Sequence, residues 1–139
     1  MNSNFSADLE YNNLFHMVAT GENVPEEINI IVEIFKGSRV KYEYNKKAGA
    51  VMVDRILHTP IPYPFSYGLI PQTWNDYDHD PLDAIIICKE ELLPECIVPC
   101  RTIGMLSVDD TGERVVIGPV IIMQGSCDEI GGLDTGFIL

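Results

Sequence analysis

The sequence predicts a mainly β (α+β) fold, a small β-barrel with few short helices. Several short segments rich in β-branched residues follow one another closely and are separated by turn-forming residues, which is typical of small barrels. The chain has 139 residues, which fits one domain spanning 1–139. Its apolar fraction of 46% is enough to form a core without disulfide bonds.

The N-terminal segment predicts one helix followed by a buried strand. Residues 7–19 carry a loose helical pattern, and we interpret residues 1–23 as a helical extension of the domain. Residues 28–35 are a nearly unbroken run of apolar residues, many of them β-branched, which is typical of a strand buried on both faces. Glu33 interrupts this run and is therefore a candidate functional residue.

A hairpin is predicted next. Polar and apolar residues alternate over 40–44, so that Lys41 and Glu43 share one face of a strand. Residues 45–49 contain turn-forming residues, and 50–57 predicts the returning strand.

The C-terminal half is predicted to hold a long loop and three further strands. Residues 58–81 are rich in proline and are expected to form an ordered loop, followed by a short buried strand over 82–88. Residues 103–108 and 114–123 are the remaining strand candidates, and 113–139 are interpreted as a divergent tail.

Charge and cysteine usage exclude several classes of protein. The net charge of −12 argues against a nucleic-acid binder and against docking on an anionic membrane. The longest apolar stretch, 115–123, is too short to span a bilayer. Four irregularly spaced cysteines do not form a disulfide framework, so we expect reduced thiols and a cytoplasmic location.

An acidic motif carries the strongest chemical signal. Asp76 and Asp78 are followed by Asp80 and Asp83, and carboxylates this close repel one another unless a cation lies among them. A solvated acidic loop is the alternative. Pro81 stiffens the motif and a buried strand follows it directly, so we favour a site for hard divalent cations such as Mg²⁺.

A calcium-binding EF-hand is excluded for this motif. Its first three acidic positions would match, but the position that requires glycine holds Pro81, and the position that requires a bidentate glutamate holds Ile87.

Basic residues complete the set of groups expected for phosphoryl transfer. Six of them gather within residues 36–55: Lys36, Arg39, Lys41, Lys46, Lys47 and Arg55. Four charged residues lie inside predicted strands: Glu33, Lys41, Glu43 and Arg55. Charges in such positions are costly unless they are paired, so mutual ion pairing is the alternative interpretation for each of these four. Carboxylates together with convergent Lys, Arg and Tyr are the groups that position and neutralise a phosphate substrate.

Five motifs in order resemble the soluble family I inorganic pyrophosphatases, from about residue 24 to about residue 112. They are Glu33, Lys41-Tyr-Glu43, Val53-Asp54-Arg55, Tyr63-Pro-Phe-Ser-Tyr67-Gly68 and Asp78-His-Asp80-Pro-Leu-Asp83. The resemblance implies an OB-like barrel of five strands whose mouth binds pyrophosphate with several Mg²⁺ ions, for which Mn²⁺ or Zn²⁺ are potential substitutes.

The resemblance also implies roles for individual residues. Asp78, Asp83 and Asp110 would hold metal, with Asp83 bridging two ions, and Asp80 would be the general base that deprotonates the attacking water. Lys41, Arg55 and Tyr67 would bind phosphate groups, and Glu33 and Glu43 would support the metal site. His79 departs from the small or acidic residue usual in the family, and a homo-oligomer is expected.

The C-terminal part departs from the family pattern. No Asp-x-Lys follows Gly112, and the last lysine and tyrosine of the sequence are Lys89 and Tyr77, so the family's C-terminal phosphate ligands have no counterpart. We therefore expect an incomplete C-terminal part of the barrel, weakened Mg²⁺ binding, and weak or undetectable hydrolysis of pyrophosphate.

Two other functions stay open at this stage. A non-catalytic metal- or phosphate-binding relative, or an assembly module, would keep the aspartates without turnover. A hydrolase for another phosphoanhydride, such as a nucleotide, would use Trp74 and Tyr77 to stack a base, although packing of the loop is the favoured interpretation of these two rings.

Overall fold

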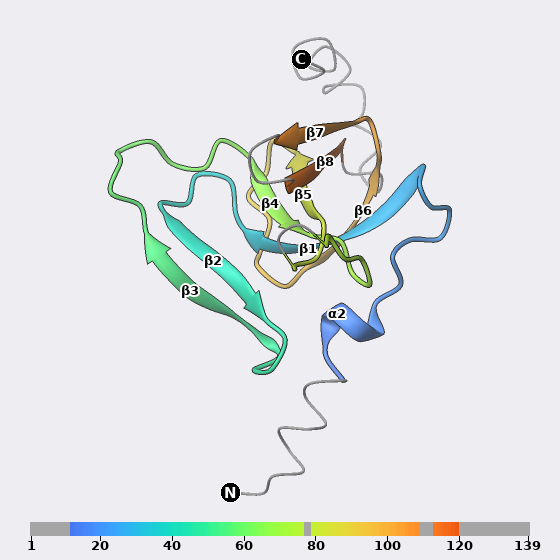
Figure 1. Cartoon of the computed structure of the whole chain (residues 1–139). Coiled ribbons are helices and arrows are strands. Elements are labelled where there is room, and N and C mark those ends of the chain that lie inside the picture. Colours follow the sequence, from blue (N-terminus) through green and yellow to red (C-terminus); the bar gives the residue numbers. More distant parts are fainter. Residues whose placement is uncertain (1–11, 77–78, 109–112, 120–139) are drawn as a thin grey trace, which may run out of the picture.

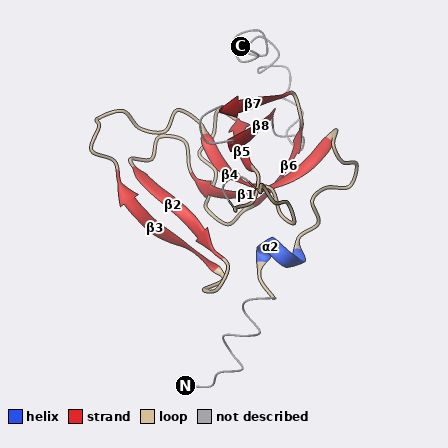
Figure 2. Cartoon of the chain, in the orientation of Figure 1, coloured by secondary structure: helices blue, strands red, loops and turns tan. Residues whose placement is uncertain are grey.

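The computed structural model describes residues 12–76, 79–108 and 113–119, and this part of the chain is mostly strands (Figures 1 and 2). The elements are α2 (Leu14–Met17), β1 (Glu27–Ile34), β2 (Val40–Asn45), β3 (Ala50–Ile56), β4 (Ser66–Leu69), β5 (Asp83–Ile87), β6 (Ile97–Arg101), β7 (Gly104–Val108) and β8 (Glu113–Pro119). No helix among the described residues is long and apolar enough to cross a membrane.

A curled sheet forms the body of the domain, and the predicted OB-like β fold is confirmed. Its strand order is β6-β1-β4-β5-β8-β7, with antiparallel pairs throughout except for the parallel pair β5–β8. Among the described residues the curled sheet has six strands rather than the five expected, and β2 and β3 form a separate two-stranded hairpin beside it (Figure 1).

Two strands were not predicted from the sequence. β4 lies inside the predicted loop 58–81, where it pairs with both β1 and β5. β6 contains Pro99, which has no N–H to donate, but β6 is an edge strand of the sheet and so has one neighbour fewer to bond.

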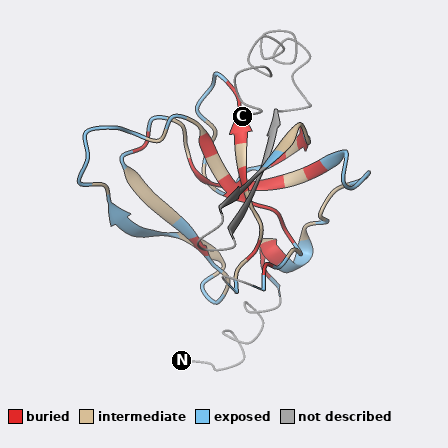
Figure 3. Cartoon of the chain, turned by 45° about the horizontal axis from the view of Figure 1, so that its top comes forward, coloured by how far each residue is buried: buried red, intermediate tan, exposed pale blue. Residues whose placement is uncertain are grey.

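The core explains why β1 is a continuous apolar run. Ile28, Ile30 and Val32 pack with residues of β5 and β6 in one cluster. Ile31 lies on the other face of β1 and packs with Phe15 and Tyr44 in a second cluster. Figure 3 shows the buried residues concentrated on β1, β4 and β5, whereas β3 is exposed over much of its length.

The second cluster depends on α2, which covers only Leu14–Met17 within the described part, 12–19, of the helix predicted over 7–19. The Asn13 side chain accepts a hydrogen bond from the His16 N–H at 3.3 Å and caps the helix. Val18 adopts an extended conformation and ends it. Residues 1–11 and 109–112 lie outside the described residues, as do 120–139 of the predicted tail.

Gly68 lets β4 approach β1 closely. A Cβ atom at this position would collide with the Ile31 carbonyl oxygen, which is backbone and has little freedom to move. We expect Gly68→Ala to destabilise the protein by about 2 kcal/mol, because strands β1 and β4 would have to separate. The measurement is the free energy of urea unfolding.

Gly104→Ala is the matched control for this prediction. A Cβ atom at Gly104 meets nothing within 4 Å, so this variant should unfold as the wild type does. Equal unfolding free energies for the two variants would show that the close approach of β4 to β1 does not limit stability.

Candidate functional site

A cavity of about 330 Å³ lies between strand β2 of the hairpin, the curled sheet and the loop that carries the acidic motif (the acidic loop). The charged residues that line it are Glu33 from β1, Lys41 and Glu43 from β2, Lys46 after β2, and Asp80 and Asp83 around the start of β5, and Tyr67 from β4 lies beside them. The sequence had singled out all of these residues except Lys46 as site residues.

Glu33 reaches the cavity because β1 is bulged at this residue. The pairing of β1 with β4 shifts register between Val32 and Ile34, which leaves Glu33 as the extra residue. Its side chain is only 7% exposed, and its Oε2 accepts a hydrogen bond of 2.7 Å from the Tyr44 N–H. The carboxylate therefore bridges the curled sheet and the hairpin.

Burial dominates the ionisation of Glu33. It raises the pKa of this carboxyl to about 7 against the opposing effect of the Tyr44 hydrogen bond, and the charges of Glu43 and Asp80 add to the rise. Several carboxylates thus influence one another across this cavity.

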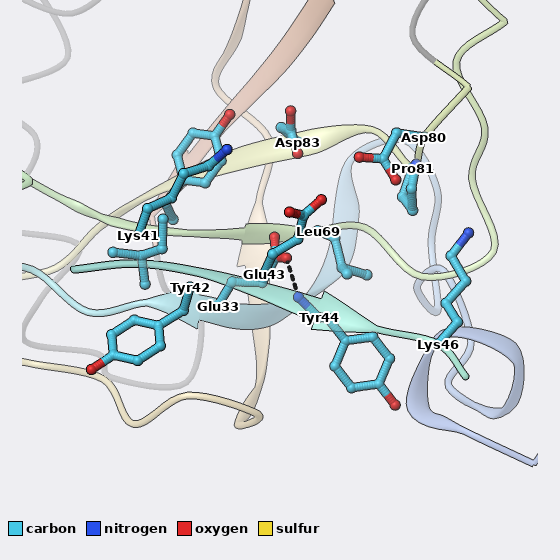
Figure 4. A pocket seen from close by; sticks show the side chains of 12 residues that line it. Glu33, Lys41, Tyr42, Glu43, Tyr44, Lys46, Leu69, Asp80, Pro81 and Asp83 are labelled. Carbon is cyan, nitrogen blue, oxygen red and sulfur yellow. Dashed lines mark hydrogen bonds between the residues drawn. The ribbon is translucent and has the colours of Figure 1, made fainter. Parts of the chain in front are cut away.

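The hairpin strand β2 presents two charged residues to the cavity. Figure 4 shows the side chains of Lys41 and Glu43 on one side of β2 and those of Tyr42 and Tyr44 on the other, as the alternation predicted. Lys41 Nζ lies 3.1 Å from Asp54 Oδ2 of β3. Burial alone would lower the pKa of Lys41, but the hydrogen bond and charge of Asp54 outweigh it and raise the pKa.

The acidic loop is held closed by backbone hydrogen bonds around Asn75. The Asn75 N–H donates to the Asp80 carbonyl oxygen at 2.8 Å, and the His79 N–H donates to the Asn75 carbonyl oxygen at 2.9 Å. Asn75 is itself buried, so this closure places Asp80 on the cavity wall, and Asp83 follows as the first residue of β5.

His79 adopts a left-handed backbone conformation with φ of 54°. Small or short polar residues take this conformation most readily, and histidine does so at a modest cost. The loop closed by the Asn75 hydrogen bonds therefore accommodates histidine at this position.

Not every predicted site residue lies at this cavity. Arg55 of β3 lies opposite Lys41 in the register of the hairpin, but the side chain of Arg55 is 69% exposed and does not line the cavity. Asp78 and Asp110 lie outside the described residues, so their roles as metal ligands stay predictions.

The carboxylates that line the cavity are the type of ligand that hard divalent cations require. Glu33, Glu43, Asp80 and Asp83 offer only oxygen atoms, which fits Mg²⁺ better than a soft metal. Within the described residues no group of three or more His, Cys, Asp or Glu side chains is arranged closely enough to hold an ion. The donor chemistry fits Mg²⁺, while the described side chains alone form no closed metal cage.

Comparison with known proteins identifies the relatives of this chain. A family model described as inorganic pyrophosphatase matches residues 30–116. The inorganic pyrophosphatase of Haloferax volcanii is 41% identical over 111 residues, 78% of this chain and 62% of the relative. The soluble inorganic pyrophosphatase 1 of Arabidopsis thaliana is 43% identical over 100 residues, 72% of this chain and 47% of the relative.

Solved structures agree with this assignment. The crystal structure of inorganic pyrophosphatase from Ehrlichia chaffeensis matches with a TM-score of 0.74 and 31% identity, covering 85% of this chain and 74% of that one. The one from Thermus thermophilus matches with a TM-score of 0.74 and 32% identity, covering 87% and 73%. The chain thus spans about half to three fifths of the length of the two relatives matched by sequence and about three quarters of these solved chains.

Proposed function

The chain belongs to the inorganic pyrophosphatase family, and from this premise we propose that it hydrolyses inorganic pyrophosphate to two phosphates at the described cavity. The observation that carries the proposal is the convergence of four carboxylates and two lysines on one cavity within the part of the chain that matches the family. Acidic groups hold cations and basic groups hold phosphate, and a pyrophosphate substrate needs both.

In the proposed reaction a water molecule attacks one phosphorus atom and the bridging P–O bond breaks. Asp80 accepts the proton from this water, a role that its place on the cavity wall permits. Lys41 and Tyr67, which line the same cavity, bind and orient the phosphate groups. Arg55, which lies opposite Lys41 in the hairpin, is proposed to bind phosphate with them.

We propose Mg²⁺ as the cofactor, held by Asp78, Asp83 and Asp110 with support from Glu33 and Glu43, and with Mn²⁺ or Zn²⁺ as substitutes. Bound cations would neutralise the charge of pyrophosphate and lower the pKa of the attacking water. We also propose a cytoplasmic location, which is supported by Cys88, Cys96 and Cys100, since these form no disulfide bond within the described part of the chain. A homo-oligomer is part of the same proposal.

The direct test is phosphate release from Mg-pyrophosphate by the purified full chain. We expect weak turnover, because the C-terminal phosphate ligands of the family have no counterpart in this sequence. Excess EDTA should abolish this turnover and MgCl₂ in molar excess over the chelator should restore it, because cations would neutralise the substrate charge. Heat-denatured protein is the control for contaminating phosphate.

The competing function is binding without turnover. Its signature would be heat release on titration with MgCl₂ and pyrophosphate in the absence of any phosphate release. Equal hydrolysis of ATP and pyrophosphate would instead favour a broader phosphoanhydride hydrolase.

A further inference from the structure

Lys46 occupies the side of the cavity that faces the acidic loop, and its ammonium group lies between two aromatic rings. Its Nζ is 4.3 Å from the centroid of Phe15 and 4.8 Å from the centroid of Trp74. Both distances fall within the range of a cation–π interaction. One ring belongs to α2 and the other to the loop before β5, so three separate segments meet at this lysine.

The turn after β2 determines where Lys46 points. The Asn45 carbonyl oxygen accepts a hydrogen bond from the Gly49 N–H at 2.8 Å, and the Asn45 side chain accepts one from the Ala48 N–H at 2.9 Å. Strand alternation therefore ends at Asn45. Figure 4 shows Lys46 rising on the same side of β2 as Glu43, although Tyr44, two residues earlier, points the other way.

The backbone of Lys46 is fixed as well. The Asn13 side-chain amide donates to the Lys46 carbonyl oxygen at 3.1 Å, and the Leu14 N–H donates to the Tyr44 hydroxyl at 3.0 Å. The N-terminal segment thus anchors the end of the hairpin, and the lysine is held in place before any ligand arrives. Such preorganisation reduces the entropy lost on binding.

The ammonium groups of Lys46 and Lys41 have different neighbours. Lys41 forms an ion pair with Asp54 at 3.1 Å, whereas Lys46 forms none with any carboxylate of the described residues. Aromatic faces hold a cation without neutralising it. Lys46 therefore presents a full positive charge to a cavity that also contains Asp80 and Asp83.

We propose that Lys46 is an additional phosphate-binding residue of the cavity and that Phe15 and Trp74 position its ammonium group. This inference rests on the proposed function for the identity of the ligand, a pyrophosphate. Lys46 would bind one phosphate group of this ligand from the end of the hairpin. Both lysines line the same cavity, and Figure 4 shows Lys41 and Lys46 on opposite sides of it.

The test compares Lys46→Gln with Lys47→Gln, its exposed neighbour. Each variant removes one charge from the same turn, but Lys47 does not line this cavity. The readouts are steady-state hydrolysis of Mg-pyrophosphate and calorimetric binding of methylenediphosphonate, a pyrophosphate analogue that cannot be hydrolysed. Lys46→Gln should weaken analogue binding about tenfold and raise KM by a similar factor, as expected for loss of a charged hydrogen bond.

The controls should behave differently. Lys46→Arg should keep most of the affinity because the charge remains, and Lys47→Gln should stay within about twofold of the wild type, as expected for an exposed charge. Trp74→Leu should weaken binding about threefold through loss of the ring. It should cause no further loss when combined with Lys46→Gln, because the ring acts through the lysine.

The outcomes separate this inference from the proposed function. Analogue binding that depends on Lys46 without any turnover would support the inference and refute the hydrolysis. Turnover and binding that are unchanged in Lys46→Gln would refute the inference and leave the hydrolysis standing. A wild-type chain that neither binds the analogue nor hydrolyses pyrophosphate would overturn both, and fully additive losses for Trp74 and Lys46 would overturn the positioning role.

Discussion

Asp80→Asn is expected to reduce pyrophosphate hydrolysis by about 10²- to 10⁴-fold, the contribution typical of a general base. The substitution keeps the size and one oxygen of the side chain but removes its ability to take a proton at neutral pH. Because Asp80 is held in place through its carbonyl oxygen, which accepts from the Asn75 N–H, the loop should keep its closure. The measurement is kcat for phosphate release at saturating Mg-pyrophosphate.

Asp76→Asn provides the matched control for Asp80. It makes the same chemical change in the same loop, but Asp76 is exposed and does not line the cavity. We expect its kcat to stay close to that of the wild type. If Asp80→Asn retained wild-type kcat, another group would be the base. If both variants lost activity equally, the charge of the loop as a whole would matter rather than one proton acceptor.

The sequence predicted much of the site because local patterns determine where its residues point. Alternation along 40–44 predicted that Lys41 and Glu43 share a face, and β2 has this arrangement (Figure 4). Glu33 was singled out because a charge within an apolar run requires a reason, and it lies buried at the cavity. Asp83 was expected where the acidic loop enters a buried strand, and it begins β5.

Other features depend on interactions that no local pattern contains. β4 is four residues long and becomes a strand because β1 and β5 pair with it on both sides. β6 contains Pro99, and a proline argues against a strand when the sequence is considered alone. The strand tolerates it because β6 lies at the edge of the sheet. Lys46 was counted among the six basic residues of 36–55, but its direction depends on the turn after Asn45 and on contacts with Phe15 and Trp74 from distant segments.

Glu33→Gln is expected to raise the free energy of unfolding of the metal-free protein more at pH 8 than at pH 4. The difference between variant and wild type should be about 3 kcal/mol larger at pH 8. The folded-state pKa of Glu33 is raised to about 7 from 4.5, mainly by burial. A raised pKa means that the folded state binds the proton more tightly than the unfolded state does. The contribution of this group to stability is therefore fully present below pH 4.5 and is lost as the pH rises through 7.

The measurement is the free energy of urea unfolding between pH 4 and pH 9 in the presence of EDTA, which removes any cation that would stabilise the charged carboxylate. The difference between Glu33→Gln and the wild type should grow over pH 4.5 to 7 and become constant above about pH 8. The glutamine still offers an oxygen to the Tyr44 N–H, so the hydrogen bond at 2.7 Å does not account for the change.

Glu90→Gln, which alters an exposed glutamate, serves as the control and should leave the wild-type pH profile unchanged. If the difference in unfolding free energy between Glu33→Gln and the wild type did not change with pH, Glu33 would be solvated in the folded state. The predicted profile would instead show that the fold loses stability at neutral pH by keeping an ionisable carboxyl at the cavity. Such a loss is expected where a buried group serves binding or catalysis rather than folding, because a neutral isostere would stabilise the fold more.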